Sequence, residues 1–186
     1  MLSEYLKSGT REIHESTEEQ SDARFIMDCS ITMAQYVAMV TNYYQVYRGL
    51  ELEIGSVITH VDHGINKYLT NEKSTLLYKD LREMLDSKAL AQVVPINFEV
   101  GSYPQAVGMM YVMEGSMLGN SMISKKIGDC DALAAINRFH FFDPNRKMDV
   151  MRWKSFKQAL DSIVFTESEH EECLDGATYA FKSFGA

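Results

Sequence analysis

The stretch YVMEGSMLGNSMISKK, residues 111 to 126, lies in the most apolar part of the chain and places Gly115 and Gly119 inside what otherwise reads as one long helix. A glycine in a helix interior costs about 0.5–1 kcal/mol relative to alanine. Two glycines one helical turn apart therefore need an explanation. Either another helix packs closely against this surface, or a large flat ligand approaches the backbone there.

Helices are predicted before this stretch, and the stretch itself has a helix start. Apolar residues recur every three to four positions from a capping Thr32 to Ile58. Residues 74–86 form a second amphipathic pattern, with Ser74 as its expected cap. Pro104 suits the first turn of the glycine-bearing helix. Since no segment shows sustained period-two alternation, we expect an all-α fold.

Helical segments are also expected at both ends of the chain. A first helix covers residues 2 to about 19, and a short one lies near residues 22–29. The final helical segment runs from about Asp149 to Phe181. A short helix and a loop are expected between residues 87 and 102, and another loop around Pro144. The chain therefore reads as a succession of helices.

Composition limits the classes of protein to consider. With 186 residues, of which 46% are hydrophobic, the chain suits a single domain, residues 1–186, with a substantial core. The net charge of -8 and the lack of a basic cluster longer than a pair argue against nucleic acid as the main partner. The N-terminus does not resemble a signal peptide, and no run approaches the ~20 apolar residues of a membrane span. We expect a cytoplasmic protein that does not bind a membrane.

The cysteines do not indicate a covalent or metal framework. Cys29, Cys130 and Cys173 are odd in number, far apart and without a CxxC pair. We therefore expect reduced thiols.

One helical stripe near the N-terminus combines groups that suit a ligand. Lys7, Thr10, His14 and Glu18 follow at spacings of three, four and four, which places them along one helix face. A carboxylate four residues beyond a histidine can orient the imidazole, as around a metal-binding histidine. Taken alone, the same pattern also suits an ordinary solvated face.

The other histidines carry weaker signals. His60 and His63 have no third ligand nearby in sequence, so we expect them at the surface. The ESEH pattern at residues 167–170 has the spacing used in di-iron helical bundles, but such sites need the motif twice. An exposed acidic face is the expected alternative.

The glycine helix offers a surface opposite such a histidine. Gly108, Gly115 and Gly119 lie seven and four residues apart, so all three are expected near one side, with Ser116 adjacent. This low-relief apolar surface would accommodate a flat macrocycle. A histidine helix on the other side would then bind the metal of that macrocycle.

Several segments together resemble heme oxygenases. LKSGTREIHESTE (residues 6–18) resembles the family's proximal helix, and YVMEGSMLGNSMI (residues 111–123) resembles its distal helix, in the bacterial form YxxEGSxLG. TMAQYVAMVTNYYQVYRGLELEI (residues 32–54) and LYKDLREML (residues 77–85) are similar to the helices between them. The resemblance covers most of the chain. It implies an all-α bundle with heme between a proximal and a distal helix.

The resemblance assigns roles to individual residues. His14 matches the axial ligand of heme iron, with Glu18 beside it and Thr10 facing the ring. Lys7 and Lys154 match basic residues that bind heme propionates, Lys154 better than Arg152 or Lys157, and Tyr111 is a further candidate for a propionate. Gly115 and Gly119 match the glycines that let the backbone approach heme and oxygen.

Two residues depart from the family pattern. Ser116 stands where animal members have an aspartate that organises distal water, and Asn120 replaces a second consecutive glycine. Oxygen activation is therefore expected to depend on backbone groups and on water held by Ser116, with Asn120.

The activity implied by the resemblance is oxidative cleavage of heme to biliverdin, with release of iron and carbon monoxide. The reaction consumes molecular oxygen and electrons from a reductase or a ferredoxin, and its product can supply a bilin-binding photoreceptor. The in-plane rotation of heme decides which meso carbon is attacked. Two alternatives remain: a heme-binding or heme-sensing protein without turnover, and an enzyme of the related thiaminase-like architecture acting on another small molecule.

Overall fold

The computed structural model describes residues 1–58, 64–143 and 150–185, and every regular element in these ranges is a helix. The predicted all-α fold is therefore confirmed. The α-helices are α1 (Leu2–Gly9), α2 (Arg11–Gln20), α3 (Arg24–Met27), α4 (Met33–Ile58), α5 (Glu72–Met84), α6 (Ser87–Leu90), α7 (Tyr103–Lys126), α8 (Val150–Asp161) and α9 (Glu167–Phe184), and the short 3-10 helices are η1 (Asn66–Tyr68), η2 (Ile127–Asp129) and η3 (Asp131–Leu133).

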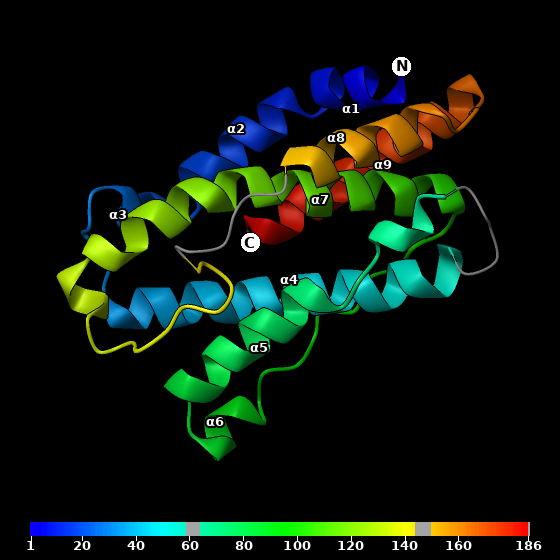
Figure 1. Ribbon diagram of the computed structural model, residues 1–186. Coiled ribbons are helices and arrows are strands. Elements are labelled where there is room, and N and C mark those ends of the chain that lie inside the picture. The colour runs from blue at the N-terminus through cyan, green and yellow to red at the C-terminus, as the bar shows by residue number, and fades with distance from the viewer. Residues whose placement is uncertain (59–63, 144–149, 186) are drawn as a thin grey trace.

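Helix α7 runs through the middle of the molecule (Figure 1). In that view α1 and α2 lie above it, α4 runs below it, and α5 and α6 lie beyond α4. None of the helices in the described ranges is long and apolar enough to cross a membrane. The predictions for His60, His63 and Pro144 concern residues outside these ranges.

Two glycines allow α7 and α9 to pack backbone against backbone. A Cβ atom on Gly108 would overlap the carbonyl of Cys173, and one on Gly176 would overlap the backbone of Gln105. Close helix packing therefore explains Gly108. The expectation that Gly108 belongs to the same ligand-facing surface as Gly115 and Gly119 is wrong, because its side faces α9.

The predicted N-terminal helix is divided at Thr10. This residue has φ −97° and ψ 0°, and it separates α1 from α2. Its hydroxyl donates to the carbonyl of Leu6 at 2.7 Å, a bond from a threonine to the preceding turn that bends helices. The backbone bond from His14 N to Thr10 O, 2.9 Å, keeps the two helices continuous across the bend. The bend therefore sets the direction in which α2 carries His14.

Two predicted caps have different outcomes. Thr32 caps α4 as expected, because its Oγ1 accepts from Gln35 N at 3.2 Å and the Gln35 side chain accepts from Thr32 N at 2.9 Å. The prediction that Ser74 caps the next helix is wrong, since α5 begins at Glu72 and Ser74 is buried within its first turn. There the carboxylate of Glu51 accepts from both the hydroxyl and the backbone N–H of Ser74. A tertiary contact has replaced the local cap.

The final helical segment is two helices rather than one. Helix α8 ends at Asp161, whose carboxylate accepts from Ser3 N and Ser3 Oγ, both at 2.8 Å. Helix α9 starts after Thr166 with a capping box, in which the Glu169 side chain accepts from Thr166 N at 2.7 Å. The sequence pattern missed this break. Glu167 is exposed, as expected for an acidic face, and Glu169 is half-buried.

The expectation of reduced thiols is wrong for two of the three cysteines. Cys29 and Cys130 form a disulfide, with their Cα atoms 4.8 Å apart. It joins the segment that follows α3 to the residue between η2 and η3, and the two cysteines are 101 residues apart in sequence. Cys173 is free and buried. The pair was hidden because the chain separation of two cysteines says nothing about their distance in the fold.

Reduction of the Cys29–Cys130 disulfide is expected to lower the free energy of unfolding by about 2–4 kcal/mol, because the bond closes a long loop in the unfolded chain. Urea denaturation with and without dithiothreitol measures the difference. The double variant Cys29→Ser/Cys130→Ser is the control, since dithiothreitol should leave its midpoint unchanged. Equal midpoints for the oxidised and reduced wild type would contradict the prediction.

Candidate functional site

A cavity of about 770 Å³ lies between the N-terminal helices and α7, with further walls from α4, α8 and α9. This volume is in the range of about 300–1,000 Å³ typical of small-molecule and cofactor sites. Of the ten residues predicted from the sequence, Lys154 does not line it and is exposed on α8. Nine line the cavity, namely Lys7, Thr10, His14, Glu18, Tyr111, Gly115, Ser116, Gly119 and Asn120.

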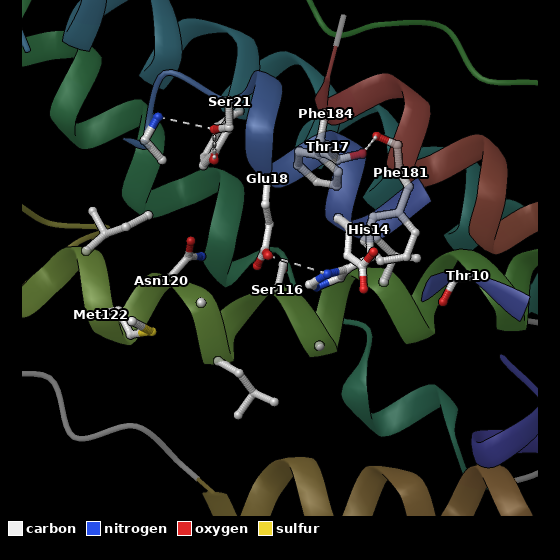
Figure 2. A pocket seen from close by; sticks show the side chains of 18 of the residues that line it. Thr10, His14, Thr17, Glu18, Ser21, Ser116, Asn120, Met122, Phe181 and Phe184 are labelled. Atoms are coloured by element: carbon white, nitrogen blue, oxygen red, sulfur yellow. Dashed lines mark hydrogen bonds and ion pairs between the residues drawn. The ribbon is translucent and has the colours of Figure 1, made fainter. Parts of the chain in front are cut away.

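His14 enters the cavity from α2 and is oriented on two sides. Its Nδ1 lies 3.7 Å from Glu18 Oε2, the pairing expected from their spacing, and Figure 2 shows the two side chains directed toward each other. The ring of Phe181 on α9 meets the imidazole edge-on, with centroids 5.3 Å apart. The imidazole is 49% exposed. Because Nδ1 faces the carboxylate, Nε2 is the nitrogen left for a ligand.

Gly119 and Gly115 form the opposite wall, on α7, and they have different surroundings. A Cβ atom added to Gly119 would meet no atom of the described part of the chain within 4 Å, so the bare backbone borders open space. A Cβ atom on Gly115 would lie 3.4 Å from Cη2 of Trp153 on α8. The absence of a side chain at Gly119 thus enlarges the cavity. At Gly115 it makes room for the indole ring of Trp153.

A polar cluster lies on the same wall between α4 and α7. The hydroxyls of Tyr47 and Ser116 are 2.6 Å apart, and Ser116 Oγ also donates to Met113 O at 2.9 Å. With its proton committed to that carbonyl, Ser116 accepts from Tyr47. Burial raises the pKa of Tyr47, while its hydrogen bonding with Ser116 and Asn120 acts in the opposite direction. The cavity wall therefore presents three coupled polar groups rather than a single serine.

Tyr47 is a site residue that the sequence pattern did not reveal. It appeared only as one apolar position in the periodic pattern of α4. A usable signal existed, because a buried tyrosine needs a partner for its hydroxyl. Trp153 and Phe181 were missed in the same way, since periodicity does not distinguish a cavity wall from a core.

Basic residues line the cavity from the N-terminal helices. Lys7 on α1 and Arg11 on α2 are both exposed. Arg24 of α3 also lines it and donates to the carbonyl of Glu19. An anionic group on a ligand could thus be held at this side.

Glu114, directly before Gly115, is the centre of a buried charged cluster behind the cavity wall. Its carboxylate pairs with Lys73 Nζ of α5 at 2.6 Å and with Arg152 Nε and Nη2 of α8 at 2.7 and 3.0 Å. The side chains of Glu114 and Lys73 are 4% and 7% exposed. Arg152 Nη2 donates further to Tyr68 O at 2.8 Å. Arg152 is therefore bound to protein, although the sequence made it a secondary candidate for a propionate.

Burial alone would raise the pKa of Glu114, but the hydrogen bonds and charges of Arg152 and Lys73 outweigh it and lower the pKa below 4.5. A depressed carboxyl pKa stabilises the fold above the unfolded-state pKa, and this contribution disappears as the pH falls through the folded-state value. We therefore expect Glu114→Gln to cost about 2 kcal/mol at neutral pH. The free energy of unfolding of Glu114→Gln should also depend less on pH below 4.5 than that of the wild type.

Urea denaturation curves recorded between pH 3 and pH 7, at intervals of about half a pH unit, measure both effects of Glu114→Gln. Glu171→Gln on the exposed face of α9 is the matched control and should follow the wild type. Equal stability of Glu114→Gln and wild type at pH 7 would contradict the assigned role.

Comparisons with known proteins agree on one family. The sequence profile of the heme oxygenase family matches residues 1–186. The chain is 33% identical over 84 residues to heme oxygenase PigA of Pseudomonas aeruginosa, a match covering 45% of this chain and 42% of that protein. The match thus spans less than half the length of this curated relative.

Solved structures share the fold over nearly the whole chain. Heme oxygenase from Leptospira interrogans superposes with a TM-score of 0.76 at 19% identity, covering 99% of this chain and 96% of that one. Heme oxygenase-1 from Synechocystis sp. PCC6803, solved in complex with heme, gives 0.78 at 18% identity, with 99% and 89% covered. The Neisseria meningitidis heme oxygenase, solved with NO and CO, gives 0.67 at 17% identity, with 99% and 88% covered.

Proposed function

Because the chain belongs to the heme oxygenase family, we propose that it binds heme as its substrate and cleaves it to biliverdin, iron and carbon monoxide. Molecular oxygen and electrons from an external reductase or ferredoxin complete the reaction. The proposal treats residues 1–186 as one heme-binding domain acting in the cytoplasm. A bilin-binding photoreceptor or a pathway that uses the released iron would consume the products.

The observation that carries the proposal is the pairing of His14 with the bare backbone at Gly119 across one cavity. A Cβ at residue 119 would occupy space that a flat ring needs, and no atom of the described residues lies within 4 Å of that position. His14 supplies a nitrogen ligand, and Lys7 and Arg11 supply cations for carboxylates. This donor set fits heme, which has an iron, a planar ring and acidic side groups.

Heme itself supplies the redox chemistry. The protein binds heme, orients it and excludes competing reactions. His14 is the proposed axial ligand, with Glu18 fixing its ring. Lys7 and Arg11 are the proposed propionate partners, to which Tyr111 and Lys154 are added from the family resemblance.

Tyr47, Ser116 and Asn120 are proposed to hold a water above the ring. The part of α7 that lines the cavity has no histidine or arginine among the described residues. Such a group would promote the O–O cleavage of a peroxidase, and its absence is consistent with attack on the ring itself.

One observation favours heme binding without turnover as the second candidate. The Ser116 proton is committed to the carbonyl of Met113 at 2.9 Å, so the serine must reorient before it can donate to a water. If it does not reorient, the protein would bind heme without cleaving it and could serve as a sensor.

Titration with hemin, followed by a reductant in air and chromatography of the pigments, tests the proposal. We expect a Soret band that bleaches while biliverdin absorbance appears. A persistent Soret band without biliverdin would favour the sensor. Failure to bind hemin would exclude both and favour a thiaminase-like enzyme acting on another small molecule.

A further inference from the structure

Trp153 is a large cavity-lining side chain to which the family resemblance assigns no role. It extends from α8 to the glycine wall of α7, where its Cη2 lies 3.4 Å from the position of a Cβ at Gly115. Its indole stacks on Phe156, with ring centroids 5.6 Å apart and planes 14° apart. The ring of Tyr111 on α7 packs against the indole, with ring centroids 5.5 Å apart. The indole is therefore confined on several sides.

The residue before Trp153 holds this part of α8 in register with α7. Arg152 forms two hydrogen bonds to the buried carboxylate of Glu114, and Trp153 contacts the next residue of α7, Gly115. Consecutive residues on one helix thus meet consecutive residues on the other. Lys73 holds Glu114 from α5 at 2.6 Å. Breaking this pairing would let the indole shift relative to the glycine wall.

The cavity wall is consequently asymmetric. Open space borders Gly119, whereas the edge of an indole covers Gly115 one turn away. A planar ring lying on this wall meets a fixed obstacle at one end and none at the other. The rim of heme is itself uneven, because its methyl, vinyl and propionate groups differ in size and polarity. Only some rotations of the ring can place a small or flat part of the rim against the indole.

We propose that Trp153 sets the in-plane rotation of bound heme, and with it the meso carbon that is cleaved, and that the Glu114–Arg152 pair is the positioning unit that holds it. The inference rests on the proposed function in taking heme as the ligand. It deepens that function by assigning regiochemistry to a side chain that recognises the rim rather than the iron or the propionates.

Proton NMR of the ferric cyanide complex tests this directly, because the shifts of the heme methyl groups report how the ring is rotated relative to the axial histidine. We expect one dominant set of methyl resonances in the wild type. In Trp153→Ala a second set should rise about fivefold or more in population. Trp153→Phe keeps an aromatic ring and should stay close to the wild type. Gln158→Ala, exposed on α8, is the matched control and should not change the spectrum.

The positioning pair has its own test. Glu114→Gln should move the methyl pattern in the same direction as Trp153→Ala while the far-ultraviolet circular dichroism stays native. A merely structural role for Glu114 would lower stability without a second set of resonances. Unchanged methyl patterns in both Trp153→Ala and Glu114→Gln would overturn the inference.

Failure of the inference is distinguishable from failure of the proposed function. If the wild type binds hemin but forms no biliverdin, turnover fails while the NMR comparison still decides the role of Trp153. If turnover occurs, the ratio of biliverdin isomers should shift in Trp153→Ala in proportion to the second set of resonances. A wild type that does not bind hemin overturns both. If Trp153→Ala alone fails to bind hemin, Glu114→Gln decides: a second set of methyl resonances supports the inference, and its absence overturns it.

Discussion

His14→Ala is expected to reduce biliverdin formation to the background of free hemin and to abolish the Soret spectrum of a histidine-ligated complex. His14 is a cavity-lining histidine with a carboxylate 3.7 Å from Nδ1, so Nε2 is the nitrogen available for iron. Axial ligand identity is a principal way in which a protein tunes heme iron. Hemin titration followed by single-turnover spectra with a reductant measures the loss.

Three controls accompany His14→Ala. His170→Ala removes a histidine of α9 that does not line the cavity and should leave binding and turnover unchanged. Glu18→Gln should weaken hemin binding by about tenfold, since partners of a ligating histidine typically affect affinity by about 10–100-fold. Added imidazole should restore the Soret spectrum of His14→Ala. A His14→Ala protein with the wild-type spectrum would remove His14 as the ligand.

Gly119→Leu is expected to have opposite effects on stability and on affinity. It should raise the stability of the free protein and weaken hemin binding by about 100-fold or more. Leucine is a better helix former than glycine by up to about 1 kcal/mol, and residue 119 is exposed with no atom within 4 Å of an added Cβ. The same side chain would occupy the space proposed for the ring. A loss of about 3 kcal/mol in contacts corresponds to roughly 100-fold in affinity.

Gly119→Ala provides the graded control for Gly119→Leu, because it adds helix propensity with a single methyl group. It should raise the urea midpoint and weaken hemin binding only slightly. Gly128→Leu, at a second open position outside the cavity, tests whether leucine alone perturbs the protein. Gly119→Leu with normal hemin affinity would mean that the ring does not lie on this part of α7.

The sequence predicted only part of the role of each glycine in α7. It identified Gly108, Gly115 and Gly119 as departures from a normal helix, and it offered helix packing and ligand approach as alternatives. Both apply, to different residues: Gly108 packs on the backbone of α9, and Gly119 borders open space. Gly115 has a third surrounding, the edge of Trp153. Spacing along one helix does not contain that information, because it depends on which neighbour lies opposite each residue.

The contacts of the polar groups likewise divide into those that the sequence predicted and those that it did not. The spacing of His14 and Glu18 predicted their contact, since both lie on one helix and helical geometry fixes which residues share a face. The partner of Ser116 was not predictable in this way. Tyr47 lies 69 residues away, and the two meet only because α4 packs against α7. Arg152 likewise looked available for a propionate until the fold placed it against Glu114.

The sequence by itself predicted the all-α fold and the approximate extent of most helices, and nine of the ten site residues that it singled out line the cavity. These depend on local periodicity and on order along the chain. Only the tertiary structure decided the Cys29–Cys130 disulfide, the replacement of the Ser74 cap by Glu51, and the registration of Trp153 against Gly115. Each of these depends on atoms that the packing of separate helices brings within a few ångströms, and that proximity is not encoded in the spacing of any one segment.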